Sequence, residues 1–290
     1  GVIVCMLRQW FVLLIPHTAQ SLPRQIANFH MFENIFTGIT FLPFARYLAA
    51  LSSTIVPPGK GMEPSFKYIK FSENIPSEES CLQAKNEIAR IFSTTDEMIT
   101  NASHGLVNRD DRLLNSVLEN ERLVDNFHNS IVEFLINVSR NAPSYLSAGP
   151  MDLVQVLHNT ERIGDHAENL VELSRYIKNK EFSLPEEKAR IILECSKEIK
   201  TIANLVKEIM ETMNKSLLER VETLAHRFKI NSLSLIQKCH VEVENKVYPQ
   251  TVAVLYEDIL SNLMSVASHM RKAARALFGY TTVQSDNNNL

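Results

Sequence analysis

The sequence predicts an all-α protein, and three observations lead to that class. Apolar residues recur at three- and four-residue spacing through most of residues 78–280. The alternation of apolar and polar residues that marks strands is nearly absent. The 290 residues contain eight glycines and eleven prolines, which is few for a sheet-rich fold with many turns. A hydrophobic content of 45% is ample for one large domain or two.

Charge and cysteine content narrow the class of protein further. A formal net charge of −3 gives no basic excess, so nucleic acid is not an expected partner. The four cysteines are far apart and form no CxxC pair, so we expect small buried side chains in a reducing compartment, not disulfides or zinc ligands. Because Gly1 leads directly into apolar sequence, we expect the C-terminal part of a longer protein, or a processed product.

Residues 1–56 have the composition of one or two membrane-associated helices. Residues 1–15 are too short and interrupted for a confident span and suit the tail of a transmembrane helix. Residues 35–55 have the length of a span, with Arg46 as the sole charge and Pro43 tolerable in a membrane helix. A kinked, buried helix of a soluble protein fits this composition equally well. Three lysines in residues 60–70 favour a cytoplasmic location for the C-terminal side.

The segment 57–77 is predicted to be a linker, because four prolines and two glycines leave little regular structure. Six helices follow. The first opens with Ser77 as N-cap and two acidic residues, and Gly105 is its expected stop. Gly279 is the expected stop of the last helix, before a disordered tail at 281–290. The predicted helices span about 78–105, 110–140, 150–179, 185–214, 216–244 and 249–278.

The third predicted helix carries an acidic stripe. Glu161, Asp165, Glu168 and Glu172 are three or four residues apart and share one helix face, which His158 extends by a turn. Like charges four apart repel by roughly 0.2–0.5 kcal/mol per pair. Such a stripe is therefore either solvated or faces a cation.

A hairpin between the second and third helices would bring more carboxylates to this stripe. If Pro143 is the tip, Asp125 and Glu161 are equally distant from it, as are Glu121 and Asp165. Four carboxylates would then meet at one height, which is costly unless a cation or water covers them. A weak internal repeat relates Glu121 to Glu222 and Glu161 to Glu257, with offsets of 101 and 96 residues (222−121 and 257−161).

The segment Glu161-Arg162-Ile163-Gly164-Asp165-His166-Ala167-Glu168-Asn169-Leu170 resembles the signature helix of PhoU-like proteins, which are helical phosphate regulators. The resemblance implies two three-helix bundles in tandem, over residues 78–280, each with an acidic motif. It also implies a multinuclear iron or zinc cluster, whose ligands would be Glu121, Asp125, Glu161 and Asp165, supported by Asn169.

The second copy of the motif is eroded, because His226 and Ser261 stand where the family has Asp. His128 and His166 are possible additional ligands in the first copy, but ordinary surface or packing roles are favoured. We expect Arg122 and Arg162 to pair with carboxylates across the bundle.

A second resemblance concerns residues 25–34 and Phe41-Leu42-Pro43-Phe44, which are similar to the end of the membrane domain of bacterial sodium/phosphate cotransporters. That family joins such a domain to a PhoU-like domain, in the order found here. The resemblance implies the C-terminal portion of a sodium-dependent phosphate symporter of the inner membrane, with a cytoplasmic regulatory domain. Sodium and phosphate would bind in the membrane part of the full-length protein. Whether the chain is a monomer or a homo-oligomer is left open.

Two other functions are weighed against the transporter. A stand-alone PhoU-type adaptor would explain residues 78–280 equally well but leaves the apolar first 56 residues without a role. A di-metal carboxylate enzyme is disfavoured because neither site helix has the Glu-x-x-His spacing of those enzymes. The sequence also has no nucleophile–base constellation, phosphate-cradling glycine loop or nucleotide fingerprint, so we predict that the chain is not an enzyme.

Overall fold

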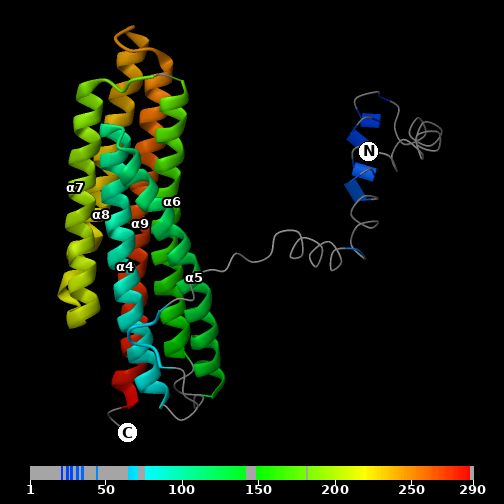
Figure 1. Cartoon of the computed structure of the whole chain (residues 1–290), viewed down its shortest axis with the longest axis vertical. Coiled ribbons are helices and arrows are strands. Elements are labelled where there is room, and N and C mark those ends of the chain that lie inside the picture. The colour runs from blue at the N-terminus through cyan, green and yellow to red at the C-terminus, as the bar shows by residue number, and fades with distance from the viewer. Residues whose placement is uncertain are drawn as a thin grey trace. The chain divides into compact units, whose positions relative to one another are not determined.

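The structure is a computed structural model that describes residues 65–70, 76–141, 148–180 and 182–287, with scattered residues between 21 and 44. The chain divides into two units, Gly1–Gly61 and Met62–Leu290. In the described part of the second unit, all regular structure is helical (Figure 1). The helices are α4 (Ser77–Asn108), α5 (Asp111–Asn141), α6 (Ala148–Asn179), α7 (Glu186–Thr212), α8 (Ser216–Glu244) and α9 (Gln250–Asn287). The all-α prediction with six long helices is confirmed.

Three predictions about helix ends are wrong. Helix α4 is capped by Pro76, not Ser77, and continues through Gly105 to Asn108, where Arg109 takes a left-handed φ of 55°. Gly105 serves packing instead, since a Cβ there would lie 2.7 Å from Leu114 Cδ2. Helix α9 likewise passes through Gly279 and reaches Asn287, so the predicted disorder of 281–290 is wrong as far as that residue. A single glycine costs about 1 kcal/mol in a helix, which is too little to end a long one.

Part of the predicted 57–77 linker is packed against α4. The backbone N–H groups of Lys67 and Tyr68 donate to Glu87 Oε2 at 3.0 and 2.9 Å. Ile69 is buried, and the Phe66 ring meets Phe127 of α5 edge-on, with centroids 5.3 Å apart. We call residues 65–70 the docked segment. It has no helix, as predicted, but it belongs to the helical unit.

The predicted membrane segments lie almost entirely outside the residues that the structure describes. Residues 1–15 lie outside the described residues, as does nearly all of 35–55. Of the helices in the part of the chain that the structure describes, none is long and apolar enough to cross a bilayer.

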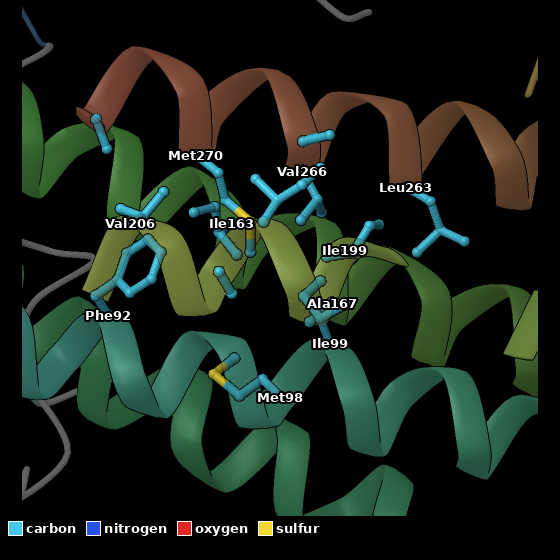
Figure 2. Packing of buried hydrophobic residues seen from close by; sticks show 14 of the residues in the cluster. Phe92, Met98, Ile99, Ile163, Ala167, Ile199, Val206, Leu263, Val266 and Met270 are labelled. Carbon is cyan, nitrogen blue, oxygen red and sulfur yellow. The ribbon is translucent and has the colours of Figure 1, made fainter. Parts of the chain in front are cut away.

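The six helices form two groups of three along one long axis. Helices α4, α5 and α6 pack together, and α7, α8 and α9 do the same. The groups join where α6 packs on α9 and α4 packs on α7 (Figure 1). Side chains from α4, α6, α7 and α9 share one core; Figure 2 labels Phe92, Met98, Ile99, Ile163, Ala167, Ile199, Val206, Leu263, Val266 and Met270.

Candidate metal centre

The candidate site lies between α5 and α6 because of the way α5 is buried. Val117, Val124, Ile131 and Leu135 recur at intervals of seven and four residues, and all are buried in the core. This anchoring leaves the intervening polar residues along the edge of α5 that meets α6. Two groups of possible metal ligands result, each drawing on both helices.

The first, the carboxylate group, consists of Glu121, Asp125 and Asp165. One oxygen from each lies within 4.8 Å of the others. Partial burial and, after it, the charges of Asp125, Glu168 and Asp165 together raise the pKa of Glu121 to about 7. The group therefore favours either a proton or a cation, as the predicted cluster of carboxylates implied.

Arg162 partly neutralises this group from within its own helix. Its Nη1 donates to Asp165 Oδ2 at 2.7 Å, one turn away on α6. The expected pairing of Arg162 across the bundle is thus wrong. Because the pair is about half exposed, its net stabilisation is small, about 0–1 kcal/mol.

The second, the histidine group, consists of His128, His158 and Glu161, with one ligand atom from each within 4.8 Å of the others. The two imidazole rings have centroids 6.2 Å apart. Burial and the Asp165 charge raise the pKa of Glu161, while the two histidines and Arg162 act in the opposite direction. The group adjoins the carboxylate group through Asp165.

Two atoms of the histidine group are buried without a hydrogen-bond partner, His128 Nε2 and Glu161 Oε2. Leaving such atoms unsatisfied costs about 1–3 kcal/mol each. An imidazole nitrogen and a carboxylate oxygen that converge in this way are ordinary ligands of zinc and iron. The donor set therefore fits the metal that the sequence resemblance implies.

From the sequence, His128 is only a possible additional ligand and His158 only an extension of the acidic stripe, yet their spacing holds a signal for both. His128 and His158 are each fifteen residues from Pro143 (143−128 and 158−143), so a hairpin places them level. The same arithmetic paired Asp125 with Glu161, whereas the structure separates these two between groups. Helix α5 ends at Asn141 and α6 begins at Ala148, so the midpoint between the two helix ends falls after position 143 in the sequence. A shift of one residue rotates a helical side chain by about 100°.

The predicted supporting residues Asn169 and His166 lie against α9. Asn169 Nδ2 donates to Asn262 Oδ1 at 3.3 Å, and His166 Nδ1 is hydrogen bonded to the same oxygen at 2.9 Å. His166 also lies near His269, with ring centroids 5.6 Å apart. These side chains connect the two bundles and do not join the carboxylates.

The second copy of the acidic motif has no comparable cluster. Glu222 accepts a hydrogen bond of 2.5 Å from Arg275 Nε, and Glu257 Oε2 is 2.9 Å from His240 Nε2. Among the described residues, both groups of possible metal ligands lie between α5 and α6. The erosion inferred from His226 and Ser261 agrees with this placement.

Comparisons with known proteins locate the resemblance on the same helices. The family model described as PhoU domain matches residues 88–174, a range that contains both ligand groups. The fold is similar to the crystal structure of PhoU from Pseudomonas aeruginosa, with a TM-score of 0.63 at 10% identity. That match covers 69% of this chain and 95% of the other. No curated protein matches in sequence. The chain thus carries a PhoU-like domain, which is consistent with phosphate-transport regulation.

Proposed function

We propose that the helical unit is a regulator of inorganic phosphate transport. The observation that carries this proposal is the PhoU-domain match over residues 88–174, the same stretch in which two ligand groups converge between α5 and α6. A regulatory role also suits a site made of carboxylates and histidines that two packed helices share. Such a site responds to metal or proton binding, and it does so at a helix–helix contact.

In the finer form of this proposal, the chain is the C-terminal portion of a sodium-dependent phosphate symporter. The order of the two sequence resemblances supports it, because residues 25–34 and 41–44 precede the PhoU-like helix as in that family. Phosphate and sodium would then bind in the membrane part. The helical unit would lie on the cytoplasmic side of the bacterial inner membrane and adjust the transport rate.

A stand-alone adaptor is the second candidate. The fold match spans 95% of a PhoU chain, so residues of this chain correspond to nearly all of that protein. In this form the helical unit would bind a separate transporter or sensor kinase. The two candidates share the regulatory role and differ in what carries the helical unit to the membrane.

A measurement of sodium-dependent uptake of radiolabelled phosphate distinguishes the symporter from the stand-alone adaptor. Cells that produce the full-length parent protein are expected to show uptake that needs sodium and that changes when Asp125→Asn and Asp165→Asn are combined. Absence of sodium-dependent uptake, with the protein recovered wholly in the cytosol, would favour the adaptor. If deletion of the protein changed neither phosphate uptake nor the response to phosphate starvation, the regulatory role itself would be wrong.

The proposal includes a bound metal, zinc or iron. The histidine group and the carboxylate group would hold it, because buried His128 Nε2 and Glu161 Oε2 have no hydrogen-bond partner and His158 Nδ1 lies 3.6 Å from the same Glu161 oxygen. Bound metal would offset the burial and the carboxylate repulsion that raise the pKa of Glu121, and it would connect α5 to α6. The chain's own contribution is to hold these donors together on two rigid helices.

Metal content of the purified full chain tests this part. We expect zinc or iron in the unaltered chain, and loss of most of it in His128→Gln/Glu161→Gln and in Asp125→Asn/Asp165→Asn. The matched control is Glu222→Gln/Glu257→Gln, which changes the corresponding glutamates of the second bundle and should retain the metal. Equal metal content in all four proteins, or none in the folded unaltered chain, would contradict a site between α5 and α6.

A further inference from the structure

The second bundle has a pocket at the position that corresponds to the acidic face of the first. It lies between α8 and α9 and has a volume of about 410 Å³. Its polar lining consists of His226, Lys229, Ser261, Ser265, Ser268 and Arg271. No carboxylate lines it, although the corresponding face of the first bundle is built from carboxylates.

The internal repeat shows which residues give the two bundles opposite charge at these corresponding faces. With the offset that relates Glu121 to Glu222, Asp125 corresponds to His226 and His128 to Lys229. With the offset that relates Glu161 to Glu257, the stripe residues Asp165, Glu168 and Glu172 correspond to Ser261, Met264 and Ser268, and Arg175 corresponds to Arg271. Glu222 and Glu257 keep the two glutamates of the repeat, but the four carboxylates compared here are replaced by neutral side chains or a histidine, whereas Lys229 is added and Arg271 is kept.

The two cations of the pocket are available to a ligand. Among the residues that the structure describes, neither Lys229 nor Arg271 is in an ion pair with a carboxylate. The nearby Glu222 is paired with Arg275, whose hydrogen bond lowers the pKa of Glu222; the charges of Arg275 and Arg271 add to that effect. Lys229 is exposed at the rim, whereas Arg271 and the three serines are partly buried.

We propose that this pocket binds a phosphate-type oxyanion, either free or as the monoester of a small molecule. The planar guanidinium of Arg271 can donate two parallel hydrogen bonds to such an anion, and the Lys229 ammonium adds a second charge. The serine hydroxyls supply further donors at the same wall. A volume of about 410 Å³ is within the usual range of small-molecule pockets, roughly 300–1,000 Å³, and leaves room beside a phosphoryl group.

The charge pattern argues against a metal in this pocket. Divalent cations need anionic or neutral donors, and the two permanent charges here are both positive. The pocket is therefore the chemical opposite of the site between α5 and α6. The inference goes beyond the proposed regulatory role and depends on neither of its two forms.

Calorimetric titration of the full chain at low ionic strength tests the proposal, with inorganic phosphate and glycerol 3-phosphate as separate ligands. We expect at least one to bind, and Lys229→Gln/Arg271→Gln to weaken that binding tenfold or more. The control is Arg227→Gln/Lys272→Gln, which removes the same charge from neighbouring residues outside the pocket lining and should bind normally. Lys229→Arg keeps the charge and should retain most of the affinity.

The outcomes distinguish a free anion from a monoester as the ligand. They also distinguish binding in the pocket from general attraction to positive charge. Tighter binding of glycerol 3-phosphate would assign the monoester, and tighter binding of inorganic phosphate the free anion. Equal loss of affinity in the pocket variant and the control would overturn the proposal, as would absence of binding of both ligands by the folded unaltered chain. Circular dichroism confirms that each variant is folded. This assay does not measure phosphate uptake. Absence of binding would therefore contradict the anion pocket without contradicting the regulatory role.

Discussion

At the scale of single residues, Glu121 is half-buried beside Asp125, Glu168 and Asp165, and its pKa is raised from 4.5 to about 7. Burial is the largest cause, followed by the nearest carboxylate. A carboxyl group with a higher pKa in the folded chain binds more protons there than in the unfolded chain. Its contribution to stability is therefore complete below about pH 4.5 and is lost as the pH rises through about 7.

We expect Glu121→Gln to remove this pH dependence. In the presence of a chelator, the variant should gain at most about 1 kcal/mol in unfolding free energy at pH 8, because solvent screens part of the effect. At pH 5 the two proteins should differ little. Urea unfolding followed by helical circular dichroism measures both values.

Glu222→Gln is the matched control, because Arg275 lowers the pKa of Glu222 instead of raising it. That variant should show no gain at pH 8. A gain in Glu121→Gln that is the same at pH 5 and pH 8 would mean that the substitution acts through packing or helix propensity, not through charge.

The carboxylate stripe could be predicted from sequence because spacing within one helix fixes which residues share a face. Which residues of α5 would meet that face was only partly predictable. It depends on the hairpin connection, residues 142–147, and a shift of one residue there turns a side chain away from its partner. For this reason Glu161 was expected beside Asp125 and instead lies with His128 and His158.

At the scale of elements, the docked segment is attached to α4 by one buried carboxylate. Glu87 is 0% exposed and accepts the N–H groups of Lys67 and Tyr68 through one oxygen. Its other oxygen accepts a hydrogen bond of 2.6 Å from Arg90 Nε. Arg90 in turn lies over the Phe127 ring, 4.5 Å from its centroid, so the attachment connects α4 to α5 as well.

Removal of this acceptor should release the docked segment. We expect Glu87→Ala to raise amide hydrogen exchange at Lys67 and Tyr68 by at least tenfold. The unfolding free energy should fall by about 1–3 kcal/mol, because a buried acceptor is lost and its donors are left without a partner. Exchange detected by mass spectrometry, together with urea unfolding, measures the two effects.

Gln83→Ala is the control, since Gln83 Oε1 accepts only the exposed Lys70 N–H in this segment, at 3.0 Å. It should change exchange near Lys70 and leave Lys67 and Tyr68 protected. Unchanged protection of those two amides in Glu87→Ala would show that Ile69 and Phe66 hold the segment by apolar packing alone.

The helices themselves were predictable from apolar periodicity, and their order agrees with the structure, as do their lengths except at the C-terminal ends of α4 and α9. The docked segment was not predictable. It has no periodicity, and a glutamate in the first helix gives no local sign that it accepts backbone N–H groups twenty residues away. A glycine does not predict a helix end in this chain, because Gly105 and Gly279 are tolerated within long helices.

At the scale of the whole helical unit, the two bundles share a core. Ile163 and Ala167 of α6 lie among side chains of α7 and α9, such as Val206 and Met270 (Figure 2). A polar contact adds to this join, since buried Asp96 of α4 accepts hydrogen bonds from two lysines of α7. A metal between α5 and α6 and an anion between α8 and α9 would therefore act on one packed unit.

If the core is shared, a destabilising substitution in the first bundle should also destabilise the second bundle. Ile163 is 0% exposed, and Ile163→Ala should lower the unfolding free energy by about 2–5 kcal/mol. We expect amide exchange to accelerate by a similar factor in α6 and in α9. Ile230→Ala on exposed α8 surface is the control and should change stability by less than about 0.5 kcal/mol. Faster exchange in α4–α6 with undiminished protection in α7–α9 would instead show that the bundles unfold independently. Coupling between the two sites through the core would then be excluded.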